Sequence, residues 1–294
     1  MKVGVFGQFY HDDSEEYILT LLEALDEKGI RVMVEAKYLE LIRHFLDEGK
    51  DYETFSSFED LDPDCDMFFS MGGDGTMLRT ILYIRDLGIP VLGINTGRLG
   101  FLATVQKEDI RKAVDSISRG SFDVVDRALL EVHTDPVNQE LSEFNFALNE
   151  VAVSRKDTTS MITVATYLND EYLTSYWADG LIIATPTGST GYSLSCGGPV
   201  LTPDTTGFVI TPIAPHNLNA RPLVIPDDTV IKLKVSGREK NYLISLDSRL
   251  ATLPEETEIT IKKSTFAMKM VELRTESFLK TLRNKLLWGE DKRN

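Results

Sequence analysis

The stretch FFSMGGDGTMLRTIL, residues 68–82, decides the fold class of this chain. Its apolar run, residues 68–71, is typical of a buried strand, and the residues after Thr76 carry apolar side chains at helical spacing. Three glycines lie between the two segments. A strand, a glycine turn and a helix in this order hold phosphate with backbone N–H groups and a helix N-terminus. The turn also carries Asp74, an anion, so the sequence predicts a phosphate site with a carboxylate beside it for chemistry.

Strand-like and helical segments alternate over residues 1–125. The predicted strands are residues 3–9, 31–36, 66–73 and 90–97, and the predicted helices are residues 15–30, 39–49, 76–88 and 108–120. This alternation predicts parallel βα units and therefore a Rossmann-like α/β domain, a parallel sheet with helices, over residues 1–125. Ligands of such sheets bind at the carboxyl ends of the strands, where GGDGT (72–76) and NTGRLGF (95–101) lie.

The pattern changes in residues 126–275, where short apolar segments are separated by turn residues. Asn169-Asp170 lies between two of these segments and is typical of a hairpin. Residues 257–263 and 266–273 are predicted as two separate strands. The whole region predicts a β-rich domain of the sandwich type. Residues 276–294 return to helical spacing and are predicted to form a C-terminal helical tail.

The composition argues against a nucleic-acid-binding, a disulfide-rich or a membrane-spanning protein. The 294 residues carry a net charge of −15, which argues against a broad basic face for nucleic acid. Cys65 and Cys196 are the only cysteines, too few for a disulfide framework or a Cys-based zinc site, and they fit a reducing compartment. The N-terminal residues show no signal-peptide pattern, and the apolar runs are shorter than the ~18 residues of a membrane span. We therefore expect a cytoplasmic protein with no nucleic-acid or membrane partner.

GGDGT differs from the common phosphate-loop signatures. No Lys-Ser/Thr pair follows the glycines, and the spacing is not G-x-G-x-x-G. One interpretation is a plain tight turn, since Asp and Gly are frequent turn residues. The position between a buried strand and a helix favours a functional loop instead. There, Asp74 could accept a proton from a hydroxyl that attacks a phosphoryl group, or help to hold Mg²⁺.

Two further segments place polar residues where a ligand could bind. A strand-like run leads into PTGSTGYSLSCGGP (186–199), which is dense in hydroxyls and glycines. The chain has no G-x-S-x-G elbow for a serine hydrolase, so the segment is either a ligand-lining loop or a plain Ser/Thr-rich loop. Asn149 and Glu150 interrupt an apolar strand. Both side chains could touch one ligand only at a strand end or a bulge, and the alternative is a polar rim.

Together these motifs resemble the NAD kinase family. The matching stretches, in the family's order, are GGDGT (72–76), NTGRLGF (95–101), Asn149-Glu150, DGLIIATPTGSTGYSLSCGGP (179–199) and PIAPHNLNARPLVIP (212–226). The resemblance implies an N-terminal Rossmann-like domain, a C-terminal β domain and a helical tail that packs back. It also implies transfer of the γ-phosphoryl group of ATP to the 2′-hydroxyl of the adenosine ribose of NAD, giving NADP. A divalent metal such as Mg²⁺ and a homo-oligomer, dimer or tetramer, are implied as well.

The resemblance also assigns roles to residues by their position in the motifs. Asp74 would be the general base, Gly75 its neighbour in the phosphate loop, and Arg79 a basic residue after that loop. The residues implied to bind the dinucleotide are Phe101, near the adenine, together with Asn149, Glu150, Asp179, Ser189, Thr190, Gly191, Tyr192, Ser193, Leu194, Ser195 and Asp247. No metal ligand is assigned.

Three positions depart from the family's pattern. Gly191 replaces a common alanine, and Trp177 stands at a basic position, where a phosphate contact would be lost or replaced by stacking. Relatives have Gly-Gln or Gly-His after the aspartate, whereas Ser248-Arg249 follow Asp247 here.

Two other functions share part of the pattern. A related kinase for a sugar phosphate or a lipid would carry GGDG, but the hydroxyl-rich segment and Asn149-Glu150 count against it. A non-catalytic dinucleotide sensor would keep the pocket but would not need Asp74.

Overall fold

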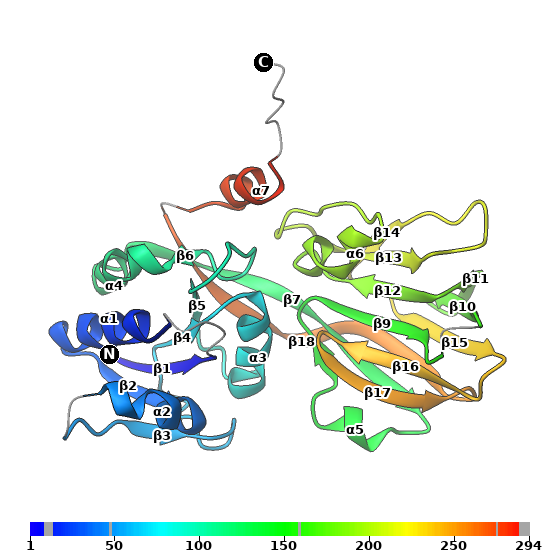
Figure 1. Ribbon diagram of the computed structural model, residues 1–294. Helices are drawn as coiled ribbons and strands as arrows, with labels where there is room; N and C mark the ends of the chain where they lie inside the picture. Colours follow the sequence, from blue (N-terminus) through cyan, green and yellow to red (C-terminus); the bar gives the residue numbers. More distant parts are fainter. Residues whose placement is uncertain (9–13, 47–48, 158–159, 275, 288–294) are drawn as a thin grey trace, which may run out of the picture. The chain divides into compact units, whose positions relative to one another are not determined.

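The computed structural model describes residues 1–8, 14–46, 49–157, 160–274 and 276–287 (Figure 1). The chain folds into two compact units, residues 1–126 with 268–294, and residues 127–267. It passes from one unit to the other inside β7 (Phe122–Asp135) and again inside β18 (Glu258–Leu273). The second boundary differs from the one predicted after residue 275, because the end of β18 pairs with β5 (Val91–Asn95) of the first unit.

The first unit is the predicted parallel sheet with helices. Its strands lie in the order β18, β5, β4, β1, β2, β3, and β6 also pairs with β5. The further bounds are β1 (Lys2–Gly7), β2 (Arg31–Glu35), β3 (Glu53–Phe55), β4 (Met67–Met71), β6 (Val105–Gln106), α1 (Ser14–Glu27), α2 (Ala36–Ile42), α3 (Asp74–Ile84), α4 (Ile110–Ser118) and α7 (Phe278–Leu286). All of these strand pairings are parallel, which confirms the Rossmann-like prediction.

Helices cover both faces of this sheet. Every residue of β4 and β5 is buried, as expected for central strands of a parallel sheet. The helices α1, α2 and α4 pack on the face that carries Val3, Val5 and Phe69. The helix α3 covers the opposite face, where Thr80 donates a hydrogen bond of 2.9 Å to Ser70 of β4.

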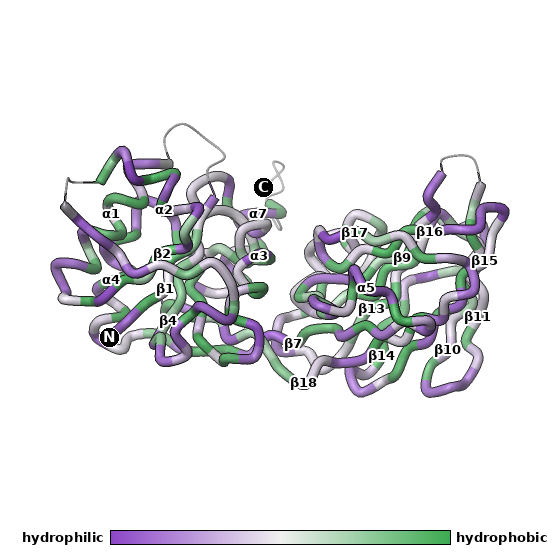
Figure 2. Tube along the Cα trace, turned by 90° about the horizontal axis from the view of Figure 1, so that it is seen from below, coloured by the Kyte–Doolittle hydropathy of each residue, from purple (hydrophilic) through white to green (hydrophobic). Residues whose placement is uncertain are grey.

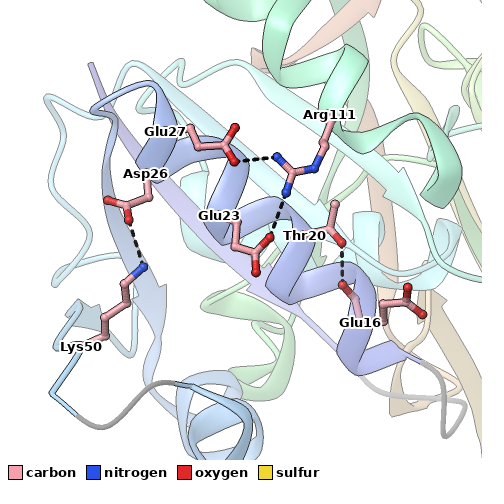
Figure 3. Close-up of polar contacts among 7 residues, drawn as sticks. All are labelled: Glu16, Thr20, Glu23, Asp26, Glu27, Lys50 and Arg111. Atoms are coloured by element: carbon pink, nitrogen blue, oxygen red, sulfur yellow. Dashed lines mark hydrogen bonds and ion pairs between the residues drawn. The ribbon is translucent and has the colours of Figure 1, made fainter.

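Charged side chains join the outer sides of α1 and α4 (Figure 3). Arg111 of α4 donates to Glu23 at 2.8 Å and to Glu27 at 2.9 Å, both on α1. Asp26 of α1 accepts from Lys50 at 2.9 Å. Exposed ion pairs of this kind contribute little to stability, so the apolar faces hold these helices to the sheet.

The second unit is a sandwich of two antiparallel sheets. One sheet has the order β14, β13, β12, β9, β16, β17, and the other contains β11, β10, β15 and β18, with β7 pairing with β18 and β8. The bounds are α5 (Gln139–Ser142), β8 (Phe146–Ala147), β9 (Glu150–Arg155), β10 (Ile162–Leu168), β11 (Glu171–Ala178), β12 (Gly180–Ala184), α6 (Tyr192–Ser195), β13 (Gly207–Ile213), β14 (Leu223–Pro226), β15 (Ile231–Gly237), β16 (Asn241–Leu246) and β17 (Arg249–Pro254). Side chains of both sheets form one core, in which Val151 and Val153 of β9 pack with Val164 of β10 and Leu233 of β15. Figure 2 shows hydrophobic residues, in green, along strands such as β1 and β9.

Most predicted elements agree with the structure, and two differ. The hairpin between β10 and β11 is confirmed, with positive φ angles of 50° and 67° at Asn169 and Asp170. The two strands predicted over 257–263 and 266–273 are one strand, β18, because pairing with β15 at its start and β5 near its end keeps it extended. The helix predicted over 39–49 begins earlier, at Ala36, because Glu35 caps α2, and a 3₁₀ turn over Arg43–Phe45 follows its end at Ile42. Residues 47–48 of that prediction lie outside the described residues. Among the described residues no helix is long and apolar enough to cross a membrane.

Candidate functional site

Two loops of the first unit lie side by side at the carboxyl edge of its sheet. The strands β4 and β5 are parallel neighbours, so residues 72–76 and 96–103 leave the sheet at the same edge. The helix α3 begins at Asp74, with Gly73 as its N-cap. This arrangement is the strand, glycine turn and helix that the sequence predicts.

Asp74 holds the neighbouring loop by its backbone. Its Oδ2 accepts from the N–H of Phe101 at 2.9 Å, and its Oδ1 accepts from the N–H groups of Leu102 at 3.0 Å and Ala103 at 3.2 Å. Gly100 permits this approach, because a Cβ there would lie 1.9 Å from Oδ1. The carboxylate in the glycine turn therefore has a structural role that sequence reasoning missed.

Asn95, the last residue of β5, shapes the first part of the same loop. It is buried, its Nδ2 donates to the carbonyl of Arg98 at 2.7 Å, and its Oδ1 accepts from the N–H of Gly97 at 2.8 Å. Sequence reasoning did not single out this residue. The signal that could have found it is an asparagine two residues before a glycine at a strand end, which favours such a turn.

In the second unit, the start of β9 lies beside the ends of its two neighbours, β12 and β16. Glu150 begins β9 and lies opposite Ala184 at the end of β12. Leu246 at the end of β16 lies opposite Val151 of β9. The pair Asn149-Glu150 is therefore at a strand end, one of the two arrangements in which both side chains could face one ligand.

Asp247 anchors this strand end in the way that Asp74 anchors its loop. Its side chain is 2% exposed. Its Oδ2 accepts from the N–H of Leu148 at 3.0 Å, and its Oδ1 accepts from those of Asn149 at 2.8 Å and Glu150 at 3.2 Å. The residue acts on the candidate site through the backbone of residues 148–150.

Arg249, one of the departures from the family's pattern, has a structural role. Its guanidinium donates to the carbonyl oxygens of Phe144, at 2.7 Å, and Phe146. It also lies over the ring of Phe146, at 5.3 Å from the centroid, and its Nη2 is 3.9 Å from Oδ2 of Asp247. This side chain therefore supports both the chain before Leu148 and the buried carboxylate.

Asn149 and Glu150 carry buried polar atoms that lack a partner among the described residues. These atoms are Oδ1 of Asn149 and Oε2 of Glu150. Both side chains approach Gly191, where a Cβ would lie 3.1 Å from Oε2 of Glu150 and 3.6 Å from Nδ2 of Asn149. Buried polar atoms without partners are costly, so these two oxygens make the pair a candidate for contact with a ligand.

Most hydroxyls of residues 185–195 bond to the protein itself. The contacts are Thr185 Oγ1 to Leu148 O at 2.6 Å, Ser189 Oγ to Pro186 O at 2.6 Å, Thr190 Oγ1 to Thr187 O at 3.1 Å, and Ser193 Oγ with Thr211 Oγ1 at 2.8 Å. Gly188 lies against the backbone of Asn149, since a Cβ there would come 2.0 Å from its carbonyl oxygen. The segment is a compact turn that packs on the strand end.

The remaining predicted residues of these segments differ in exposure. Gly75 and Arg79 are exposed on α3, and Phe101 is half-buried. In the second unit Tyr192 and Ser195 are exposed, whereas Leu194 is half-buried.

Asp179 lies at the opposite end of β12 from Thr185. There its Oδ1 pairs with Nη1 of Arg155 at 2.9 Å. The exposed Trp177, two residues earlier, has its ring centroid 5.2 Å from that of His216. The structure therefore does not bring Asp179 to the strand end that carries Asn149-Glu150.

Two family models match the chain. The ATP-NAD kinase N-terminal domain matches residues 3–122, which contain Asp74, and the ATP-NAD kinase C-terminal domain matches residues 148–273, which contain Asn149-Glu150 and Asp247. The chain belongs to the ATP-NAD kinase family. It is accordingly an enzyme that phosphorylates NAD to NADP with ATP as the phosphoryl donor.

Individual members of the ATP-NAD kinase family are similar over their whole length. An NAD kinase of Christiangramia forsetii is 60% identical over 294 residues, with 100% of both chains covered. An NAD kinase from Archaeoglobus fulgidus in complex with ATP has a TM-score of 0.75 at 27% identity, covering 98% of this chain and 99% of that one. Yeast NADH kinase complexed with NADH shares the fold, with a TM-score of 0.87 at 23% identity and coverage of 99% and 88%.

Glu150 allows a test of the strand-end site through stability. Burial, with repulsion from Asp247, raises the pKa of its carboxyl group from 4.5 to about 7, although the backbone N–H of Tyr192 opposes this. Between these pH values the folded chain keeps a proton that the unfolded chain has released, so the free energy of unfolding falls as the pH rises. We expect Glu150→Gln to be more stable than the parent at pH 8, by roughly 1–3 kcal/mol, with the gain lost near pH 4.5.

The same variant should bind NAD more weakly, with the KM for NAD about 10- to 100-fold higher, because an amide accepts fewer hydrogen bonds than a carboxylate. Thermal unfolding at both pH values and steady-state kinetics measure the two effects. Glu171→Gln, at an exposed position on β11, is the matched control. A Glu150→Gln protein that is less stable than the parent at pH 8 would contradict the account.

Proposed function

We propose that Asp74 is the general base of the phosphoryl transfer. The 2′-hydroxyl oxygen of the adenosine ribose of NAD attacks the γ-phosphorus of ATP in line, and the bond from that phosphorus to the ADP oxygen breaks. The hydroxyl proton passes to Oδ2 of Asp74. Because this proton becomes acidic only as the new O–P bond forms, a carboxylate is a sufficient base.

The observation that carries this proposal is the uneven use of the two carboxylate oxygens of Asp74. Oδ1 accepts from two backbone N–H groups, whereas Oδ2 accepts from one. A carboxylate offers about two lone-pair sites on each oxygen, so Oδ2 has capacity for a substrate hydroxyl. The three bonds also fix the direction in which the carboxylate points, as a proton acceptor requires.

The start of α3 supports phosphate binding next to this base. The first N–H groups of a helix and its dipole favour an anion. Gly75 is exposed, and nothing packs within 4 Å of the place where a Cβ would stand, so a phosphate could approach the backbone there. Arg79, exposed further along the same helix, adds a positive charge.

The proposed dinucleotide-binding residues act in two ways. The residues that we place in contact with NAD are Phe101 in the first unit and, in the second unit, Asn149, Glu150, Thr190, Gly191, Tyr192, Leu194 and Ser195. The unpartnered oxygens of Asn149 and Glu150 support this most directly, because ribose hydroxyls would satisfy them. Asp179 lies at the opposite end of β12, so its proposed contact with NAD rests on the family resemblance alone. The residues that we place behind the contacting ones are Ser189, Ser193 and Asp247, whose side chains bond to the protein.

We propose that the divalent metal is held chiefly by the phosphate oxygens of ATP. Among the described residues no group of three or more His, Cys, Asp or Glu side chains could hold a metal ion, so this part of the chain offers no protein cage. Mg²⁺ commonly binds through substrate phosphates and one or two carboxylates, which suits this residue set. When bound, the metal offsets the charge that spreads over the phosphoryl oxygens.

We also propose a homo-oligomer, a dimer or tetramer, and a cytoplasmic location. The strands β11 and β14 are sheet edges, and they carry the exposed side chains of Tyr172, Trp177 and Val224. Exposed apolar side chains on edge strands are typical of interfaces. Both cysteines are free thiols, which fits the reducing environment of the cytoplasm.

Asp74→Asn separates the two roles of this residue. Loss of the base should lower kcat by about 10²-fold or more. An amide also presents N–H groups to the N–H donors of residues 101–103, so their hydrogen–deuterium exchange should become faster. Gly100→Ala is the comparison, since its Cβ would displace the carboxylate but leave the base in the chain. Nearly full turnover in Asp74→Asn would exclude it as the base.

The activity itself has a direct test. Purified protein with NAD, ATP and Mg²⁺ should form NADP, detected by an NADP-dependent dehydrogenase. Without ATP, or with a chelator in excess over Mg²⁺, formation of NADP should stop. Formation of NADP with the chelator present would contradict the proposed metal dependence.

The assembly is measured by size-exclusion chromatography with light scattering. We expect a mass two or four times that of one chain. Val224→Lys, at the edge strand β14, should lower this mass, whereas Leu41→Lys, at an exposed apolar position on α2, should not. A monomeric parent protein would overturn the proposed assembly.

A further inference from the structure

The helix α7 returns to the loop that Asp74 holds. Lys285 of α7 donates from Nζ to the carbonyl oxygen of Leu99 at 2.6 Å. The same Nζ lies over the ring of Phe101, 5.4 Å from the centroid, within the range of a cation–π interaction. Phe278, at the start of α7, has its ring centroid 6.3 Å from that of Phe101. All four residues belong to the first unit.

The sequence builds α7 so that its last turn can make these contacts. Ser277 is the N-cap, and its side chain accepts from the N–H of Lys280 at 3.2 Å. Thr281 and Leu282 are the buried residues of the helix, which fix the side that faces the unit. A lysine in the last turn also suits the negative end of the helix dipole.

Asp74 and Lys285 therefore both hold this loop, and both of them contact Phe101. Its backbone N–H donates to Oδ2 of Asp74 at 2.9 Å, while its ring lies under Lys285. The carbonyl of Leu99, two residues earlier, accepts from the same ammonium group. One cation thus fixes the backbone and the aromatic ring of a single short segment.

We propose that Lys285 is a positioning residue of the NAD site. It holds Leu99 and the ring of Phe101 in place, so that the ring is preformed for the dinucleotide, while the three N–H bonds to Asp74 are made without it. This inference rests on the proposed contact of Phe101 with NAD. A group that only preorganises the binding surface should affect the KM for NAD and leave kcat nearly unchanged.

The test compares Lys285→Met with two matched variants. Methionine keeps the length and the apolar stem of the side chain and removes the charge. Lys285→Arg keeps a cation that can donate to the carbonyl and lie over the ring. Arg283→Met removes a charge from an exposed position in the same turn of α7.

Two readouts are measured on the full chain. The first is hydrogen–deuterium exchange of peptides that cover residues 97–103, without any nucleotide. The second is the KM for NAD and kcat. In Lys285→Met we expect faster exchange in this loop and a KM about three- to tenfold higher, with kcat within about twofold of the parent. Lys285→Arg and Arg283→Met should resemble the parent in both readouts.

Unchanged exchange or an unchanged KM in Lys285→Met would overturn the proposal, as would the same defect in Arg283→Met. Phe101→Leu separates this failure from a failure of the proposed site. If Phe101→Leu raises the KM for NAD and Lys285→Met does not, Phe101 binds NAD without the help of Lys285. If neither variant raises it, the contact of Phe101 with NAD is itself wrong.

Discussion

In each of the two units, the candidate binding residues depend on the same interaction, a carboxylate that accepts from three consecutive backbone N–H groups. Asp74 binds the amides of residues 101–103, and Asp247 binds those of residues 148–150. Consecutive N–H groups converge only on a tightly curved backbone, and such a concave arrangement calls for an anion. Each of these donors left buried and unpaired would cost roughly 1–3 kcal/mol. The two carboxylates therefore set the backbone shape from which the proposed ligand-binding side chains project.

Because Asp247 bonds to the backbone at the start of β9, it leaves one side-chain oxygen each of Asn149 and Glu150 without a partner among the described residues. Asp247 accepts from the backbone N–H groups there, and four hydroxyls of residues 185–195 bond to backbone carbonyls or to the hydroxyl of Thr211. Oδ1 of Asn149 and Oε2 of Glu150 are left over among the described residues. Proteins keep such atoms where function requires them, at a cost in stability. The raised pKa of Glu150, caused mainly by burial, shows that its carboxylate is electrostatically destabilised in the folded protein.

The local part of this architecture was predictable from the sequence, and the long-range part was not. The strand, glycine turn and helix around GGDGT follow from patterns over about a dozen residues. By contrast, Asp74 meets Phe101 across 27 residues and Asp247 meets Leu148 across 99, separations over which periodicity carries no information. The sequence also indicated that the hydroxyl-rich segment 185–195 follows a strand, which is β12. The direction of each hydroxyl was not predictable, because tertiary contacts set the backbone that aims it.

The first unit is built from the first and the last residues of the chain, so it is the last unit to be complete during synthesis. The first unit contains the N-terminal residues, yet one of its strands is the end of β18, and α7 follows later still. Domains generally fold as they leave the ribosome, N-terminal part first, but this unit is complete only after residues 127–267 have been translated. Until then part of the β5 edge has no partner from β18. The loop around Phe101 can contact Lys285 only when nearly the whole chain has been made, so a partly translated chain lacks this contact.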